Sequence, residues 1–301
     1  MKLAEVDDVV ITIVVDNYAD LLLPSRPGIE RFGEVKEPLL AEHGLSVHLQ
    51  LGEAGPAILM DAGISGVALP HNLSRLGIDP RAVDQVMISH GHPDHTGALE
   101  VFLRLSWKRT PVVVHPDAFL ERWRLLSDGS REGPWQQDRQ SWEKAGAEIV
   151  SVMEPRELAP GCLATGPIPR RTDFEKVTSS ALYREGTELV HDPIRDDQAI
   201  LINVKGKGLL VVSGCAHSGI VNTIIHGQEI SGVERVWAVL GGFHLSGSDP
   251  RTLGRTIAEI KRLDPQLVMP FHCTGFEATR EFAAEMPDQF VLAAVGTTLK
   301  F

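Results

Sequence analysis

The stretch "ISHGHPDHTGALE" (residues 88–100) places three histidines and one aspartate within six positions, namely His90, His92, Asp94 and His95. Imidazole and carboxylate groups are common metal ligands, and ligands come clustered whereas structural histidines do not. A polar surface turn would need none of these side chains. The stretch therefore predicts a metal site.

The position of this stretch along the chain favours a functional loop. The apolar run "QVMIS" (85–89) predicts a short strand that ends at the first histidine, and "TGALEVFLRL" (96–105) has helical spacing. The histidines thus lie between the end of a strand and the start of a helix. Such junctions often carry function, because strand ends are rigid and helix N-termini have free N–H groups.

The rest of the chain alternates between β-branched runs and amphipathic segments. Strands are predicted at 9–17, 45–52, 56–63, 110–115, 198–204, 208–215, 236–242, 267–270 and 290–295, and helices at 66–78, 116–126, from 218 onward, 250–263 and 275–285. Residues 127–198 predict a less regular insertion with short strands at 147–152 and 181–185. Both halves run from strands to helices, which predicts one α/β domain over residues 1–301, a sandwich of two sheets covered by helices.

Composition limits the class of protein. The net charge of −11 disfavours general attraction to nucleic acid or anionic lipid. The three cysteines are odd in number and widely spaced, which predicts a reducing compartment without a disulfide framework. The N-terminal apolar run follows acidic residues, unlike a signal peptide, and no uncharged run approaches the ~20 residues of a membrane span. We expect a cytoplasmic protein with a small-molecule substrate, and leave a homo-oligomer open.

Further histidines follow the same pattern of an apolar strand that ends in a polar loop. They are His115, His217, His244 and His272. One histidine in such a place is more often structural, but the repetition predicts that they converge on one site. His90 and His92 would share one metal and Asp94 and His95 a second, with His217 and His272 completing the two sets.

Several motifs carry a resemblance to a known family. "SHGHPDHTG" resembles the HxHxDH motif of the metallo-β-lactamase superfamily, and "LMDAG" resembles the aspartate-containing strand end before it. A closer resemblance, through "VDNY", "EHGLS", "TGPIPRRTDFE", "DDQAI", "SGCAHSGIVNTI", "GGFHL" and "PFHCTG", is to the subgroup named for dihydropterin-methyl-(ribofuranosyl)aminobenzene 5′-phosphate synthase. This resemblance implies an αββα sandwich with two divalent metal ions, zinc foremost and iron or manganese as alternatives.

One residue departs from the superfamily pattern. Where many members have a metal-bridging aspartate, this chain has Cys215. The cysteine would either ligate as a thiolate or pack as a small apolar group, and we expect His217 rather than Cys215 to be the ligand. Asp61 would accept a hydrogen bond from a ligand imidazole or cap a turn. His115 is likewise expected to support the ligands without binding metal itself.

Other residues are predicted to serve catalysis and substrate. Asp94 and His244 are the catalytic candidates, the histidine as a proton donor or oxyanion contact unless it is structural. Candidates for substrate binding are Arg170, Arg171, Asp196, Asp197 and Asn17. Arginines on a proline-bounded loop suit phosphate, the paired aspartates suit an amino-pyrimidine edge unless they only form a turn, and the helix N-terminus after His217 would be a further anion seat.

Three functions are compatible with these residues. The first is hydrolysis of an anionic small-molecule ester, with a phosphate-containing one expected, by metal-activated water. The second is the transferase implied by the subgroup name, in which a pyrophosphate leaves and an organic nucleophile attacks. The third is a metal-dependent sensor without turnover, against which the full ligand set argues.

Overall fold

The first layer of the molecule is an eight-stranded sheet. The computed structural model describes residues 2–176 and 180–301. The strand order is β2 (Ile29–Glu30), β18 (Thr298–Lys300), β1 (Val9–Val15), β3 (Ser46–Leu51), β4 (Ala57–Met60), β5 (Gln85–Met87), β6 (Thr110–Val114) and β9 (Ala147–Ser151). The four neighbouring strands β4, β5, β6 and β9 run parallel, so their carboxyl ends meet at one edge of the sheet.

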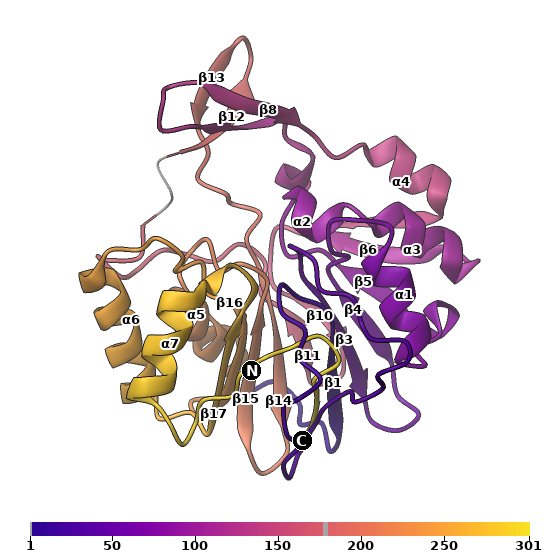
Figure 1. The fold of residues 1–301 in the computed structure, drawn as a ribbon. Coiled ribbons are helices and arrows are strands. Elements are labelled where there is room, and N and C mark those ends of the chain that lie inside the picture. Colours follow the sequence, from indigo (N-terminus) through magenta and orange to yellow (C-terminus); the bar gives the residue numbers. More distant parts are fainter. Residues whose placement is uncertain (1, 177–179) are drawn as a thin grey trace.

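A second, six-stranded sheet faces the first (Figure 1). Its order is β10 (Arg156–Ala159), β11 (Cys162–Ala164), β14 (Ala199–Val204), β15 (Gly208–Ser213), β16 (Val236–Gly242) and β17 (Leu267–Phe271). The hairpin β14–β15 is antiparallel, and β15, β16 and β17 are parallel. Polar loops that follow these three parallel strands therefore lie together.

The core between the sheets is made of the alternate, inward-facing residues of both. Ile11 and Met60 of the first sheet and Leu210 and Leu240 of the second belong to one buried cluster. Helices cover the outer faces, with α1 (Ala68–Arg75) and α3 (Leu99–Ser106) on the first sheet and α5 (Ile220–Ser231), α6 (Pro250–Leu263) and α7 (Phe276–Glu285) on the second. This is the αββα sandwich that the sequence predicted.

A third sheet stands above the sandwich in Figure 1. Its order is β13 (Glu188–His191), β12 (Ala181–Glu185), β7 (Arg122–Leu125) and β8 (Arg131–Trp135). The segment 127–198 is more regular than predicted, because it also supplies α4 (Arg139–Ala145) and the strands β9, β10 and β11 of the sandwich. Both short strands expected within it, at 147–152 and 181–185, are present as β9 and β12.

Two predicted elements are wrong. The expected helix at 116–126 is a short 3-10 turn, Pro116–Phe119, followed by β7, because the next residues pair with β12 and β8 in the third sheet. The expected strand at 290–295 is irregular, its N–H groups bonding singly to Val268 and Tyr18, and the chain enters the first sheet only afterwards, as β18 between β1 and β2. Among the described residues no helix is long and apolar enough to cross a membrane.

Candidate metal centre

The predicted histidines converge where the strands of both sheets end. His90 follows β5, with His92 and the short helix α2 (Pro93–Thr96) after it, while His217 follows β15, His244 follows β16 and His272 follows β17 in the turn His272–Thr274. Because parallel strands end at a common edge, side chains from distant parts of the sequence meet here. The repeated pattern of an apolar strand followed by a histidine-containing loop therefore predicted correctly that these side chains lie together.

The first cluster consists of three imidazoles, those of His90, His92 and His217. His90 Nε2 lies 2.9 Å from His92 Nδ1 and 3.1 Å from His217 Nε2. Burial lowers the pKa of His92 to about 4 and the pKa of His90 and His217 well below its usual range. Three neutral imidazoles that aim ring nitrogens at one point are a donor set that fits a divalent ion such as zinc.

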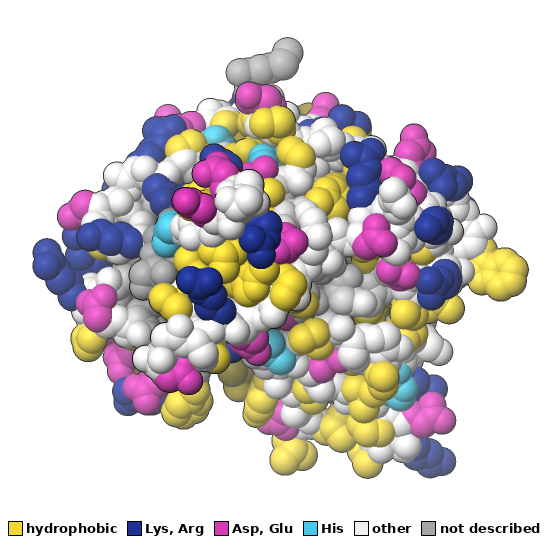
Figure 2. Space-filling view, turned by 90° about the horizontal axis from the view of Figure 1, so that it is seen from above, with side chains coloured by type: hydrophobic (Ala, Val, Ile, Leu, Met, Phe, Trp, Pro, Cys, Tyr) yellow, Lys and Arg dark blue, Asp and Glu magenta, His cyan; other side chains and the backbone are white. Residues whose placement is uncertain are grey.

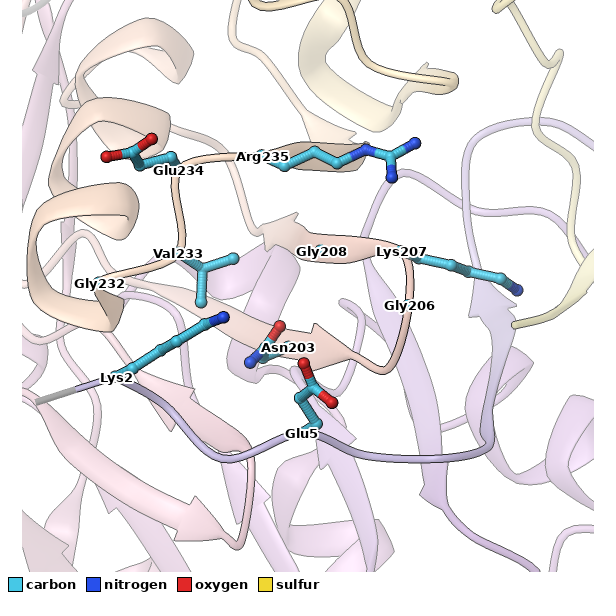
Figure 3. Close-up of a pocket in the computed structure, with 10 residues that line it drawn as sticks. All are labelled: Lys2, Glu5, Asn203, Gly206, Lys207, Gly208, Gly232, Val233, Glu234 and Arg235. Carbon is cyan, nitrogen blue, oxygen red and sulfur yellow. The ribbon is translucent and has the colours of Figure 1, made fainter.

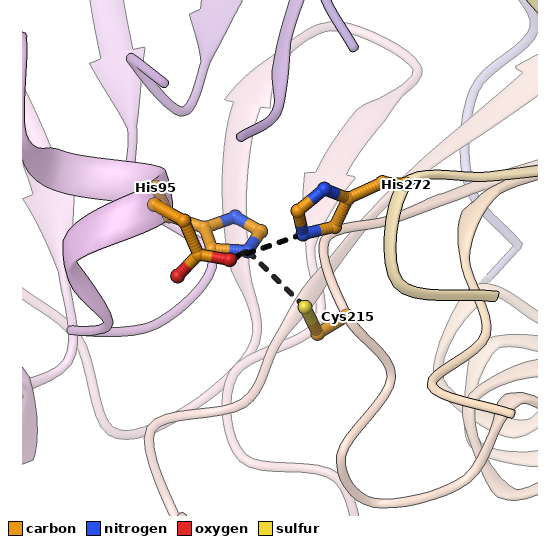
Figure 4. Close-up of side chains that lie close together, drawn as sticks. His95, Cys215 and His272 are labelled. Carbon is orange, nitrogen blue, oxygen red and sulfur yellow. Dashed lines mark hydrogen bonds and ion pairs between the residues drawn. The ribbon is translucent and has the colours of Figure 1, made fainter. Parts of the chain in front are cut away.

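The second cluster combines Asp94, His95, Cys215 and His272, whose donor atoms lie within 4.8 Å of one another. His95 Nε2 is 3.1 Å from Cys215 Sγ, and His272 Nε2 is 3.2 Å from Asp94 Oδ2 (Figure 4). The His272 ring is buried, and its Nε2 faces the Asp94 carboxylate together with the His95 and Cys215 donors, a mixed donor set that fits a cation-binding role. The two clusters adjoin, because the rings of His90 and His95 are 4.2 Å apart.

Charge coupling is strong in the second cluster. Burial alone would raise the pKa of Asp94, but His95 and His272 beside it hold that pKa well below its usual range. Burial would likewise lower the pKa of His95, whereas Asp94 and Asp61 raise it to about 9. The carboxylates and imidazoles thus stabilise one another's charged forms, an arrangement that a bound cation can replace.

Cys215 differs from expectation in its placement. We expected the thiol to stand outside the ligand set, but its sulfur lies among the donors of the second cluster. His217 lies in the first cluster, as expected. The sequence left a thiolate ligand open at Cys215, and the geometry favours that alternative.

Residues of the first sheet orient the second cluster. Asp61 Oδ2 accepts a hydrogen bond from His95 Nδ1 at 2.7 Å, and its two oxygens also accept from Ser89 Oγ and N. This bond fixes the tautomer that leaves His95 Nε2 facing the cluster. Asn17 Nδ2 donates to the carbonyl of His272 at 3.1 Å, so Asn17 contacts a ligand loop rather than standing free for substrate as expected.

Two adjacent aspartates brace the first cluster. Asp196 Oδ2 accepts from Gly91 N, between two ligand histidines, at 2.8 Å, and Asp197 Oδ2 accepts from Ser218 N, beside the third, at 2.7 Å. Both aspartates are buried, 0% and 1% exposed. They hold the ligand loops together instead of presenting carboxylates to a substrate, which corrects the expected role.

Behind them, a buried arginine links the clusters to the third sheet. Arg122 of β7 donates from Nε to Asp192 at 2.7 Å and from Nη2 to Asp196 at 2.6 Å. Its side chain is 1% exposed. The guanidinium offsets part of the negative charge of the two carboxylates and holds both in a buried place.

The predicted anion-binding residues divide in two. Arg170 is half-buried near the carbonyl of His217, and its Nε is buried without a hydrogen-bond partner, so it remains a candidate. Arg171 is exposed and forms an ion pair with Glu229 of α5. The expected anion seat at the start of α5 is occupied, because Glu175 accepts hydrogen bonds from Val221 N and Asn222 N.

The two remaining candidate histidines lie in different surroundings. His115 Nδ1 accepts the N–H of Asp117 and so caps the turn Pro116–Phe119; it belongs to no ligand group among the described residues. His244 lies against His217, with ring centroids 4.2 Å apart, and belongs to a third donor group with Cys215 and Cys273.

The backbone is strained at several residues in and next to the two clusters. Asp61, Ala216, His244 and His272 all have positive φ, between 48° and 58°. Residues other than glycine rarely adopt this conformation, and it persists where the surrounding structure enforces it, often at functional sites.

The sequence missed Ser89, Arg122, Glu175 and Cys273. Two of them had a signal, since Ser89 and Cys273 stand next to predicted ligands. Arg122 fell in the wrongly predicted helix, and Glu175 shows its role only through its contact with α5.

Within residues 2–176 and 180–301, no comparable group of donors lies away from this site. Seen from above, side chains of both charges are interspersed on the drawn face (Figure 2). A hollow at the other end of β15 combines Lys2, Lys207 and Arg235 with Glu5 and Glu234 (Figure 3). The hollow begins beside Gly208, the first residue of that strand, and so lies away from the clusters that follow its last residue.

A metal site of this kind, between the two sheets of an αββα sandwich, is the arrangement of one superfamily. Residues 44–221 match the family model described as the metallo-beta-lactamase superfamily, and the chain belongs to that superfamily.

Three individual proteins show which members of the superfamily the chain resembles. The chain is 31% identical over 307 residues, 100% of its own length and 99% of the relative's, to 7,8-dihydropterin-6-methyl-4-(beta-D-ribofuranosyl)-aminobenzene-5'-phosphate synthase of Methanocaldococcus jannaschii. The crystal structure of Tm1679, a metal-dependent hydrolase of the beta-lactamase superfamily, has a TM-score of 0.78 and 25% identity, over 97% of this chain and 98% of that one. N-acyl homoserine lactonase AiiB of Agrobacterium fabrum is 30% identical over 107 residues, 33% of this chain and 36% of the lactonase.

Proposed function

We propose that the protein is a metal-dependent hydrolase that cleaves an ester of a small anionic, phosphate-containing molecule. The observation that carries the proposal is the pair of adjoining donor clusters, three imidazoles beside a carboxylate, two imidazoles and a thiol. Two divalent ions held there would supply a water acidified toward neutrality and positive charge for the developing oxyanion. Zinc suits the combination of imidazole and thiol best, with iron or manganese as alternatives.

The chain's own residues supply the rest of the chemistry. Asp94, a member of the second cluster that is 18% exposed at its side chain, can accept a proton from the attacking water. His244, packed on His217, places a ring where it can donate a proton to the leaving oxygen. Arg170 has a buried N–H without a partner near the first cluster and can hold a phosphate oxygen.

A second function has its own support. The full-length likeness to the synthase favours a transferase that uses the same ligands, with an organic nucleophile in place of water and a departing pyrophosphate. The hydrolase and the transferase differ only in the acceptor.

The test is to load the purified protein with zinc, manganese or iron and to screen phosphomonoesters, phosphodiesters, pyrophosphate esters, lactones and thioesters in ¹⁸O-labelled water. A hydrolase incorporates ¹⁸O into one product, and chelation followed by the metal abolishes and then restores turnover. Turnover only with an added aromatic amine, with pyrophosphate released and no ¹⁸O incorporated, would establish the transferase instead. Ligand binding without any turnover would establish the sensor.

A further inference from the structure

A third group of donor atoms lies beside the second cluster and includes two residues that neither metal cluster uses. The Cys215 sulfur, a ring nitrogen of His244 and the Cys273 sulfur lie within 4.8 Å of one another. They come from the three loops that follow β15, β16 and β17. Three neighbouring strands of one sheet thus each contribute one donor.

The backbone around these atoms makes room for them. A side chain at Gly242 would place its Cβ 2.6 Å from Cys273 Sγ and 2.4 Å from the carbonyl oxygen of Gly214, so only glycine leaves this space to the thiol. The Cys273 thiol donates to the carbonyl of Cys215 at 3.7 Å and also contacts the side chain of His244. His244 itself has a φ of 48°, a left-handed conformation that turns its loop back toward the strand ends.

The chemistry of this group differs from that of both clusters. Two sulfurs and one imidazole form a softer set than three imidazoles, or than a set that includes a carboxylate. Thiolate ligands select zinc, cadmium or copper(I) over magnesium and manganese, and tetrahedral zinc accepts three protein ligands and a water. Cys215 is common to this group and to the second cluster, so its sulfur would belong to both.

We propose that Cys215, His244 and Cys273 form a third metal site, selective for thiophilic cations, which shares Cys215 with the second cluster. An ion at this site binds the ring of His244 and removes it from proton transfer. Excess thiophilic metal therefore inhibits the enzyme. This consequence rests on the proposed function, whereas the site itself does not.

The test is a titration of the metal-free, full-length protein with Cd²⁺ under a non-thiol reductant, followed by native mass spectrometry and by thiolate-to-cadmium absorption in the ultraviolet. We expect three ions per chain for the wild type and two for Cys273→Ala, with the third ion's affinity at least tenfold lower and part of the absorption lost. Cys162→Ala is the matched control, since Cys162 lies in the core between the sheets, and it keeps three ions.

Two results would overturn the site: a wild type that binds only two ions, or a Cys273→Ala protein that binds as many as the wild type with unchanged absorption. Circular dichroism confirms that each variant is folded. The inhibition is measured separately, as activity against excess Zn²⁺, and we expect it in the wild type and not in Cys273→Ala. Failure of the proposed hydrolase would remove this second readout and leave the ion count intact.

Discussion

The two metal clusters differ both in their donors and in the parts of the molecule that hold them. The first has three neutral imidazoles and is braced by Asp196 and Asp197, in the connection between β13 and β14. The second contains a carboxylate and a thiol and is braced by Asp61 and Asn17 of the first sheet.

This difference has a chemical and a mechanical consequence. An ion among neutral imidazoles keeps its full positive charge, whereas Asp94 and a Cys215 thiolate would offset the charge of an ion in the second cluster. An ion bound in the first cluster would therefore be the stronger Lewis acid. Asp61 touches both sides, because Ser89 Oγ donates to it and also lies 2.9 Å from His90 Nδ1. Asp196 and Asn17 contact different ligand loops, so substitutions of these two residues should affect the two clusters independently.

The largest expected effect is the removal of one ligand from each cluster. His92→Ala and Asp94→Ala should each abolish turnover and lower the bound metal by one ion per chain, because each loses a donor from a different cluster. Elemental analysis and activity are measured on the same samples, with thermal unfolding as a check on folding. Full activity in either variant would contradict the two-cluster site.

Binding of an anionic substrate should depend on Arg170, which lies beside the first cluster. Arg170→Ala should raise KM for a phosphoester by roughly 10- to 150-fold, the equivalent of the ~1.5–3 kcal/mol of a hydrogen bond to a charged group. Arg171→Ala is the matched control and should leave KM unchanged, because Arg171 pairs with Glu229 at the surface. Metal content should be constant in both. Equal effects of the two substitutions would remove the distinction that the structure draws between them.

The contribution of Asp196 to metal binding in the first cluster can be tested against Asp192, because both aspartates pair with Arg122. Asp196→Asn should lower the first cluster's metal affinity by about 10- to 100-fold, as is typical when a group that orients ligands is lost. Asp192→Asn also removes a carboxylate from Arg122, but Asp192 does not contact a ligand loop, so metal affinity should change little. Competition of each variant with a chromophoric chelator measures both ions. The same loss in both variants would mean that the ion pair, and not the bond to Gly91, matters.

The smallest effect is expected at the second cluster's brace. Asn17→Ala removes the hydrogen bond to the carbonyl of His272 and a longer contact, 3.3 Å, between Asn17 Oδ1 and His272 Nδ1. Because the longer contact is weak, the second ion should be weakened by roughly 2- to 12-fold, the range of one neutral hydrogen bond. The first ion should be unaffected. Weakening of the first ion instead would show that the two braces are coupled.

The sequence predicted the sandwich and the convergence of most of the donor residues for a physical reason. Buried parallel strands are continuous apolar runs, so a histidine directly after such a run marks the end of a strand. His217 and His272 could therefore be identified as candidates without a structure. The HxHxDH stretch is local and carries its own geometry. Both signals depend on residues close together in the chain.

What the sequence could not predict depends on partners far away in the chain. Arg122 reads as part of a helix until β12 pairs with it, and nothing local marks it as the neighbour of Asp196. Glu175 closes the start of α5 because the fold carries a distant carboxylate there. The position of Cys215 was open for the same reason, since the direction of a side chain in a tight loop is set by the strands on both sides.

The left-handed backbone at Ala216 has a consequence for protein engineering. Ala216 lies between two candidate ligands and has a φ of 52°, a conformation that costs an alanine about 1–2 kcal/mol relative to glycine. Ala216→Gly is therefore an accessible route to a more heat-resistant variant, offset in part by the greater freedom of glycine in the unfolded chain. The same freedom would loosen the loop that carries Cys215 and His217. At this position thermal tolerance and the precision of the metal centre are opposed, and a library selected only for heat resistance should accumulate glycine here as it loses activity.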